Sequence, residues 1–249
     1  MNENRRKFLK RGASALAGAV LVMMIPKPLR AGHEEEDGKP FDWTEHYWAY
    51  VIDTTKCIGC GNCVKACKKE NGVMEEFFRT WVERYMVNEN EHVYVDTPNG
   101  GHDGFKPRKT EGKITKSFFV PKMCNHCRNA PCIQVCPVSA SYMSPDGVVL
   151  VDDKQCIGCG YCVQACPYGA RYLNSDHVAD KCTWCHHRIW KGLKPACVTV
   201  CPTRARKFGD LKEDSEVKEI IETLRVAVLK QELRTEPFCF YIGYDRVIR

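Results

Sequence analysis

Sixteen of the seventeen cysteines in this 249-residue chain fall into four groups of four. The first and third groups share the spacing C-x2-C-x2-C-x3-C, while the second is C-x2-C-x4-C-x3-C and the fourth is C-x2-C-x11-C-x3-C. A proline follows the last cysteine in three groups, and Lys68 takes that place in the first. The groups are Cys57, Cys60, Cys63 and Cys67; Cys124, Cys127, Cys132 and Cys136; Cys156, Cys159, Cys162 and Cys166; and Cys182, Cys185, Cys197 and Cys201.

Three kinds of cysteine site compete for these groups. Disulfides are disfavoured, because cysteines three apart are poorly placed for unstrained bridges and close thiols in threes suggest a shared ligand. Structural zinc uses two C-x-x-C pairs separated by a longer loop, a pattern that only the fourth group approaches. The run C-x2-C-x2-C-x3-C, followed by proline, is the ligand pattern of bacterial [4Fe-4S] ferredoxins. The spacing therefore favours four iron–sulfur clusters as cofactors.

An internal repeat supports the same interpretation. The segment from third to fourth cysteine reads "CVKAC", "CIQVC", "CVQAC" and "CVTVC" in the four groups, with apolar residues at the same places. The fourth cysteine follows the third by about one helical turn. Gly59 and Gly61, like Gly158 and Gly160, allow the chain to curl closely around a cofactor. Four copies of one apolar-flanked turn predict four equivalent cluster sites.

Residues 1–31 have the features of a twin-arginine signal peptide. Arg5 and Arg6 precede fourteen mostly apolar residues, 12–25, and a bilayer-spanning helix needs about 20. Cleavage after Ala31 fits, although Leu29 is a poor match to the small-residue rule, and an uncleaved apolar anchor is the alternative. Clusters inserted in the cytoplasm require an export route for folded proteins, because exported bare thiols would meet disulfide chemistry. The leader and the cysteine groups thus explain each other.

The charge of the chain gives no support for a nucleic-acid partner. The whole chain has a formal net charge of +6, but residues 1–31 alone hold seven Lys/Arg and one Glu. The remainder therefore has 30 basic and 30 acidic residues and is formally neutral. We find no nucleophile–base pair, phosphate loop or open metal site in the sequence, so we expect a non-catalytic protein. No nucleic acid is expected among its partners.

The sequence resembles the four-cluster iron–sulfur subunits of the dimethyl sulfoxide reductase family and its tetrathionate-, polysulfide- and nitrite-reductase relatives. The resemblance spans residues 46–244 and rests on the order of the four groups, on "KCIGCGNCVKAC" and "QCIGCGYCVQACPYGARY", and on "DKCTWCHHRI…PACVTVCPTRARKFGDL". The closing "FCFYIGY" is similar to the C-terminal strand of the family. The tetrathionate-reductase type is the nearest.

This resemblance implies an electron-transfer protein that connects a quinone-linked integral membrane subunit with a catalytic, molybdopterin-type oxidoreductase subunit. It also implies that the first group pairs with the fourth and the second with the third, which spacing alone does not fix. The implied ligand sets for four [4Fe-4S] clusters are Cys57, Cys60, Cys63 and Cys201; Cys182, Cys185, Cys197 and Cys67; Cys124, Cys127, Cys132 and Cys166; and Cys156, Cys159, Cys162 and Cys136.

Five other residues near these groups invite a functional interpretation. Histidine can replace a thiolate, as in Rieske centres, but four cysteines are present in every group. We therefore expect these side chains to shield clusters or donate hydrogen bonds rather than to bind iron. The leftover Cys239 lies in an aromatic-rich predicted strand and is expected to be a buried, inert thiol. The other four residues are Trp184, His126, His186 and His187.

The expected fold is α+β, with two pseudo-symmetric bacterial ferredoxin-like modules, short β-hairpin insertions and a C-terminal helix. "TWVERYMV" and "EHVYVDT" predict a hairpin, "TPNGGHDGFKPRKTEG" a solvated loop, and apolar residues from Val217 to Val228 an amphipathic helix. The expected divisions are 1–31, signal peptide; 32–75, first group; 76–123, insertion; 124–177, module of the second and third groups; 178–210, fourth group; and 211–249, C-terminal helix and strand.

The function predicted is electron transfer on the periplasmic, exported side of the cytoplasmic membrane, peripheral on a membrane complex. Two rival classes remain. An autonomous exported polyferredoxin would meet soluble carriers without a fixed complex. A structural zinc protein would be colourless and contain no inorganic sulfide, so a visible spectrum separates it from both iron–sulfur classes.

Overall fold

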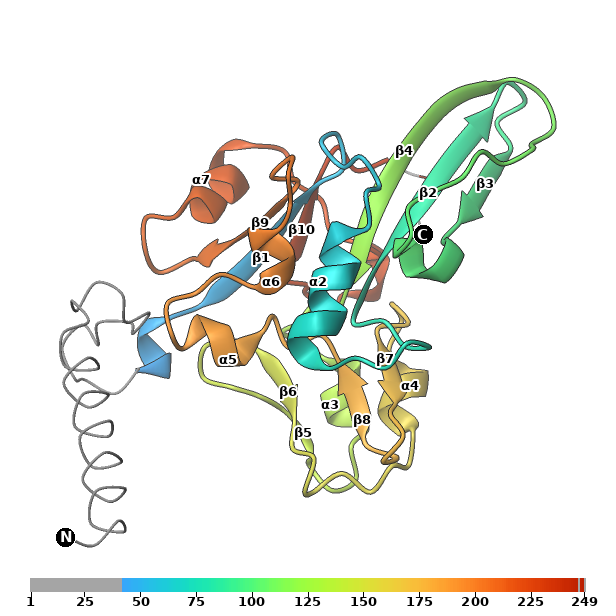
Figure 1. The fold of residues 1–249 in the computed structure, drawn as a ribbon. Coiled ribbons are helices and arrows are strands. Elements are labelled where there is room, and N and C mark those ends of the chain that lie inside the picture. The colour runs from blue at the N-terminus through green and yellow to red at the C-terminus, as the bar shows by residue number, and fades with distance from the viewer. Residues whose placement is uncertain (1–41, 246, 249) are drawn as a thin grey trace, which may run out of the picture. The chain divides into compact units, whose positions relative to one another are not determined.

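Short elements alternate with cysteine-bearing loops along the part of the chain that the structure, a computed structural model, describes: residues 42–245, 247 and 248. The predicted signal peptide, residues 1–31, lies outside these residues. The described strands form four small sheets of two or three strands each (Figure 1). No helix in this part of the chain has the length and apolar character needed to cross a bilayer.

The central sheet joins the two ends of the described chain. Its middle strand is β1 (Trp48–Asp53), with β9 (Arg206–Asp210) antiparallel on one side and β10 (Cys239–Ile242) parallel on the other. From Ala49 onward every residue of β1 is buried, as expected for a strand covered on both faces. The strand predicted from "FCFYIGY" thus exists, and it pairs with the first strand described.

The second sheet is the insertion between the first two cysteine groups. It contains β2 (Thr80–Asn88) flanked by β3 (Val93–Asp96) and β4 (Ile114–Met123), and β2 and β3 form an antiparallel hairpin where the sequence predicts one (Figure 1). The loop that follows was expected to be solvated throughout, and this expectation is wrong in part. Gly100 and Gly101, in the short helix η3 (Pro98–Gly101), are buried against Phe78 and Val82.

The second and third cysteine groups are each followed by a two-stranded sheet. The helix α3 (Pro131–Gln134) precedes the pair β5 (Ser141–Met143) and β6 (Val149–Val151), and α4 (Tyr161–Ala165) precedes β7 (Arg171–Leu173) and β8 (Ala179–Lys181). The two helices contact each other, and each contacts the strand that follows it. The same order of helix and hairpin therefore occurs twice, side by side (Figure 1).

The first group differs from the others in the length of its helix. The helix α2 (Asn62–Asn71) continues past Cys67, whereas α3, α4 and α6 (Ala196–Thr199) end before their cysteine–proline pair. Proline disfavours helical geometry in the residue before it, and Lys68 imposes no such restriction. The Lys68 ammonium instead donates hydrogen bonds to the carbonyls of Met74, Glu75 and Phe77 at 2.7–2.8 Å. The substitution for proline thus lengthens the helix and anchors the loop after it.

The C-terminal helix is shorter than predicted. The helix α7 (Glu216–Thr223) begins at the N-cap Ser215, whose hydroxyl accepts a hydrogen bond from the Lys218 N–H. It ends before Leu224 because the following residues are extended, and Ala227 forms a β-bridge with Tyr241. The apolar residues after Leu224 therefore belong to a strand-like segment rather than to a helix. The remaining elements are η2 (Trp43–Glu45), α5 (His186–Ile189) and η4 (Gln231–Leu233).

Candidate iron–sulfur sites

The first cavity of the site brings together cysteines from opposite ends of the chain. Its lining includes three cysteines of the first group and one of the fourth. The insertion contributes Val82 and Pro121 to the same wall, so this segment covers the site. Arg206, the first residue of β9, is the charged residue of the lining. The four cysteines are Cys57, Cys60, Cys63 and Cys201.

The backbone around the first group curls as its glycines allow. Gly61 is the N-cap of α2 and has φ +74°, in the left-handed region that L side chains rarely adopt. A Cβ at this position would lie 2.3 Å from the carbonyl oxygen of Gly101 and 2.5 Å from that of His102. Gly59, also at positive φ, packs against the ring of Phe119 in β4. Glycine is therefore required for both the turn and the contact with the insertion.

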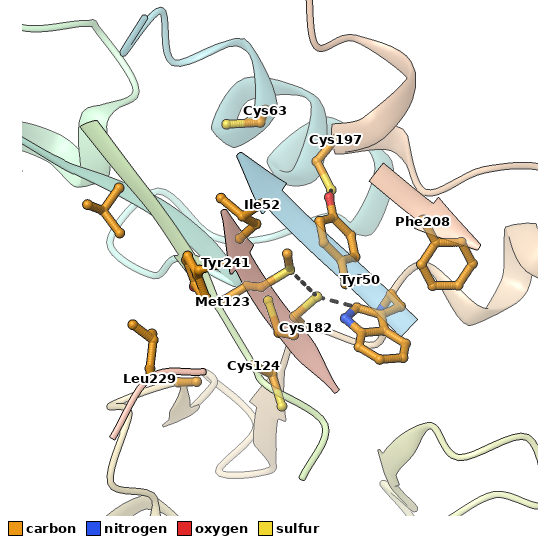
Figure 2. Close-up of a cluster of buried hydrophobic side chains, with 14 of the residues drawn as sticks. Tyr50, Ile52, Cys63, Met123, Cys124, Cys182, Cys197, Phe208, Leu229 and Tyr241 are labelled. Carbon is orange, nitrogen blue, oxygen red and sulfur yellow. Dashed lines mark hydrogen bonds between the residues drawn. The ribbon is translucent and has the colours of Figure 1, made fainter. Parts of the chain in front are cut away.

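Next to this cavity, cysteines of the first and fourth groups share polar partners. Cys67, Cys182, Cys185 and Cys197 are all buried. The amide of Asn71 donates to Cys67 Sγ at 3.6 Å and to Cys185 Sγ at 3.7 Å, so one side chain contacts both groups. The Tyr50 hydroxyl lies 3.2 Å from Cys197 Sγ, in hydrogen-bonding contact (Figure 2).

A second cavity brings together the second and third groups. Its lining includes Asn125, Tyr168 and the guanidinium-bearing Arg171, the first residue of β7. As in the first cavity, three of its cysteines come from one group and one comes from another. These cysteines are Cys124, Cys127, Cys132 and Cys166.

The remaining cysteines of these two groups lie in a more open place. Cys162 is buried, Cys136 and Cys156 are intermediate, and Cys159 is exposed. The Ala179 N–H donates to Cys156 Sγ at 3.4 Å. Burial raises the pKa of Cys136, but the backbone N–H groups of Ser141, Val138 and Ala140 outweigh it, and the net shift is downward. At Cys136, therefore, backbone amides stabilise the thiolate even without a bound metal.

At several other cysteines, burial raises the pKa and so disfavours the metal-free thiolate. Burial raises the pKa of Cys57 to about 11 and that of Cys127 to about 12. The same cause raises the pKa of Cys182 well above its usual value. Metal binding requires the thiolate, so cations bound in the cavities must offset this cost.

The residues that line the two cavities suit iron–sulfur clusters. Each cavity is lined by four cysteines, three of them from one group, and by one arginine. A [4Fe-4S] cluster takes four thiolates and is anionic with them, which suits both the donors and the arginine.

The aromatic and histidine residues near the groups have other partners. His126 and Trp184 are buried and stack on each other. His186 Nε2 lies 3.0 Å from Asp146 Oδ2, and His187 Nε2 lies 2.9 Å from Glu70 Oε1. Cys239 is buried in β10, as predicted, and burial raises the pKa of its thiol to about 12.

Sequence reasoning missed several residues that contact the cysteines. Tyr50 and Asn71 come from a strand and a helix end with no motif of their own, so no local signal could have identified them. Arg171 and Arg206 do have a signal: each follows the last cysteine of its group by five residues, in "CPYGAR" and "CPTRAR". Val82 and Pro121 of the insertion form part of the first cavity wall, and no sequence pattern in this segment indicated that role.

Comparison with known protein families gives two matches. Residues 56–140 and residues 115–211 each match a family described as a 4Fe-4S dicluster domain. Together the matches span all four cysteine groups. The chain therefore contains two 4Fe-4S dicluster domains.

Several curated proteins are similar over most of their length. The B subunit of tetrathionate reductase from Salmonella typhimurium is 39% identical over 98% of this chain and 90% of the relative. The corresponding tetrathionate reductase protein of Archaeoglobus fulgidus is 46% identical over 80% of this chain and 84% of the relative. The thiosulfate reductase electron transfer subunit of Salmonella typhi is 41% identical over 77% of this chain and 91% of the relative.

Proposed function

This chain belongs to the family of iron–sulfur subunits of tetrathionate, dimethyl sulfoxide and polysulfide reductases, and we propose that it relays electrons within such a complex. It is an electron-transfer subunit with two 4Fe-4S dicluster domains, rather than a catalytic subunit. The partners proposed are a quinone-linked integral membrane subunit and a catalytic oxidoreductase subunit of the molybdopterin type. The observation that carries this proposal is the pair of cavities, each lined by four cysteines drawn from two groups.

Four [4Fe-4S] clusters are proposed, with the first group paired to the fourth and the second to the third. Both cavities support this pairing, because each contains one cysteine of the partner group. Asn71, which contacts a cysteine from the first and one from the fourth group, supports it further. The proposed ligand sets are Cys57, Cys60, Cys63 and Cys201; Cys67, Cys182, Cys185 and Cys197; Cys124, Cys127, Cys132 and Cys166; and Cys136, Cys156, Cys159 and Cys162.

The protein contributes ligands, burial and hydrogen bonds to this function. When bound, a [4Fe-4S] cluster accepts and releases one electron at a time. Asn71 and the Ala179 N–H donate to cysteine sulfurs, and such bonds stabilise negative charge there. The backbone N–H of Trp184 donates to Cys182 Sγ at 3.4 Å and acts in the same way. Burial of most of the sixteen ligands keeps water from the clusters.

The finer architecture proposed is a pseudo-symmetric pair of ferredoxin-like modules. The module of the second and third groups occupies residues 124–177, and that of the first and fourth combines residues 32–75 with 178–210. Residues 76–123 are the insertion and residues 211–249 the C-terminal helix and strand. The repeated order of α3 with β5–β6 and α4 with β7–β8 supports this internal symmetry.

The location proposed is the periplasmic side of the cytoplasmic membrane, reached by the twin-arginine route. Arg5, Arg6 and the apolar residues after them support this assignment. Residues 1–31 are proposed to be the signal peptide.

Substitution of Cys159 by serine tests the relay, because this exposed cysteine is a proposed ligand of the outermost set. In the intact complex, Cys159→Ser should perturb one cluster and stop quinol-linked turnover. The catalytic subunit should remain active when artificial dyes supply the electrons. The matched control is Cys239→Ser, which removes a buried thiol that belongs to no ligand set. Unaltered quinol-linked rates in Cys159→Ser would contradict the relay, and an absence of acid-labile sulfide in wild-type protein would contradict the clusters themselves.

A further inference from the structure

Of the six buried Lys and Arg side chains that the structure describes, three have a carboxylate partner and three do not. Arg84 pairs with Asp96, and Lys122 pairs with Glu83. Among the residues that the structure describes, Arg171, Lys181 and Arg206 are 4% exposed or less and form no ion pair with a carboxylate. A buried charge without a counterion is strongly destabilising. These three cations therefore require an anion other than a carboxylate.

The two arginines occupy equivalent positions in sequence and in structure. Arg171 follows Cys166 by five residues and Arg206 follows Cys201 by five residues. Each is the first residue of a strand, β7 in one case and β9 in the other. Lys181 differs, because it lines neither cavity and its ammonium donates hydrogen bonds to the carbonyls of Val149 and Cys182.

Arg206 lies between the cysteines of the first and fourth groups. It lines the first cavity together with Cys57, Cys60, Cys63 and Cys201. One guanidinium nitrogen, Nη2, donates to Thr80 Oγ1 at 2.8 Å, which fixes the side chain without neutralising its charge. The thiols of Cys63 and Cys197 raise the pKa of Arg206 against the opposing effect of burial.

Those two cysteines belong to different proposed clusters of one module. Cys63 is a ligand in the set of the first cavity, and Cys197 is a ligand in the neighbouring set. Arg206 pairs with Ile52 in β1, and the hydroxyl of Tyr50 on the same strand contacts Cys197 Sγ, so the Arg206 charge lies close to both ligand sets.

Arg171 has the same relationship to the second and third groups. It lines the second cavity with Cys124, Cys127, Cys132 and Cys166. Its Nη1 donates to Ser141 Oγ at 2.9 Å, while Nε and Nη2 are buried and have no hydrogen-bond partner among the described residues. Two donors of this guanidinium are thus left for a ligand in the cavity.

The charge of Arg171 also reaches the fourth proposed ligand set, because Arg171 begins β7, which contacts the helix α4 that contains Cys162. Although burial lowers the pKa of Arg171, the thiols of Cys132, Cys124 and Cys162 raise it. The first two belong to the set of the second cavity, and Cys162 belongs to the more open set. Each arginine therefore faces two ligand sets within its own module.

We propose that Arg171 and Arg206 are redox-tuning residues, each of which raises the reduction potential of both clusters in its module. This inference rests on the proposed four-cluster function. Reduction adds one electron to a cluster and makes the cluster with its four thiolates one unit more negative, with no proton required. The electron is taken from one partner subunit and passed to the other. A fixed buried cation stabilises the reduced form more than the oxidised form, because its attraction grows with the negative charge and is weakly screened by water.

The position between two clusters gives each arginine a second effect. The arginine stabilises an electron on either cluster of its module. It therefore raises both reduction potentials without increasing the difference between them. The arginines therefore favour transfer within each module without trapping the electron on one cluster.

Glutamine substitutions of the two arginines test this inference by potentiometric titration followed by electron paramagnetic resonance. Arg206→Gln should lower the equilibrium constant for reduction of the clusters in the first–fourth module about tenfold or more. This corresponds to a fall of about 59 mV in reduction potential for a one-electron couple. The clusters of the second–third module should keep their potentials. Arg171→Gln should give the reciprocal pattern. Iron and acid-labile sulfide are measured on each sample, so loss of clusters is distinguished from a shift in potential.

Two further variants separate charge from structure. Arg204→Gln removes an arginine two residues from Arg206, with a side chain 73% exposed and paired with Glu216, and should leave every potential unchanged. Arg206→Lys keeps the buried charge and should keep the potentials of its module near wild type. If Arg206→Gln does not retain its clusters, the Lys variant and Arg171→Gln still decide the question.

Potentials that stay at wild-type values in a fully loaded glutamine variant would overturn the tuning role while leaving the four clusters established. The tuning role would also be overturned if the reduction potentials fell as far in Arg206→Lys as in Arg206→Gln, because the positive charge would then not be the cause. Wild-type protein without acid-labile sulfide would instead contradict the proposed function itself.

Discussion

The imidazole of His126 stacks on the indole of Trp184, with ring centroids 4.0 Å apart and planes inclined by 28°. His126 lies within the "CNHC" loop of the second group and Trp184 within the "CTWC" loop of the fourth. Both rings are buried, so this contact joins the cysteine loops of two different group pairs. The stack is thus a structural link between the proposed modules, and its loss should affect both.

Replacement of Trp184 by alanine should destabilise the protein strongly. Removal of a fully buried aromatic side chain typically costs about 3–5 kcal/mol because a cavity remains. We expect Trp184→Ala to lower the urea midpoint for bleaching of the visible absorbance under anaerobic conditions. Trp190→Ala is the matched control, because Trp190 is 43% exposed. Equal midpoints for the two variants would show that the stack does not hold the loops together.

The burial of His126 should make the protein sensitive to mild acid. Burial, reinforced by the charge of Lys181, holds the pKa of His126 well below its usual value. A histidine in the unfolded chain has a pKa of about 6.5. Below that pH the unfolded chain therefore binds a proton that the folded protein excludes. Folding stability should therefore fall as the pH drops below about 6.5, by up to about 1.4 kcal/mol per pH unit.

This acid sensitivity is tested by comparing urea midpoints at pH 7.5 and pH 5.5. His126→Asn lacks the titrating group and should show a smaller drop between the two pH values than wild type. His187→Asn removes a half-exposed histidine that pairs with Glu70 and should not reduce the drop. A wild-type drop that persists in His126→Asn would assign the acid sensitivity to other groups.

The two glycines that bound α2 should respond very differently to alanine. Both Gly61 and Gly72 have positive φ, so alanine at either position has a backbone cost of about 1–2 kcal/mol. Around Gly72 a Cβ would meet nothing within 4 Å, whereas at Gly61 it would lie 2.3 Å from the Gly101 oxygen. We expect Gly72→Ala to keep its iron and Gly61→Ala to lose iron from the first ligand set. Equal iron content in both variants would mean that the loop containing Gly101 can move away from the added Cβ without loss of the cluster.

Serine at two buried cysteines should give opposite results for iron content. Cys63 is a proposed ligand, and Cys239 lies in β10 and belongs to no proposed set. We expect Cys239→Ser to retain about sixteen iron atoms per chain, four for each cluster, as in wild type. Cys63→Ser should lose or weaken one cluster and show less iron and acid-labile sulfide. A large iron loss in Cys239→Ser would revise the set of ligands.

The cysteine spacing and the hairpin over β2 and β3 could be recognised from local sequence because both depend on short-range patterns. The end of α7 could not, since it depends on Ala227 pairing with Tyr241, which local periodicity does not encode. The parallel pairing of Tyr50 with Cys239 joins residues almost at opposite ends of the described chain. The carbonyls of Gly101 and His102 near Gly61 likewise depend on a long-range contact with a loop whose composition predicts solvation.

The site was predictable where it depends on spacing and unpredictable where it depends on the surroundings. The sixteen proposed ligands are identified by the sequence pattern alone. Tyr50 and Asn71 contact cysteine sulfurs only because β1 and the long α2 pass beside the fourth group. Arg171 and Arg206 were visible in the repeated "CPYGAR" and "CPTRAR", but their significance required the burial and the missing carboxylates.

The pairing of β1 with β9 and β10 determines when the central sheet can form. The middle strand leaves the ribosome well before either of its neighbours, because both follow it far along the chain. A nascent chain that still lacks residues 206–242 therefore has no partner for β1 and lacks this sheet. The proposed ligand sets of the second and third groups need no residue beyond Cys166, so only the part of the protein built around the first and fourth groups must wait for these late strands.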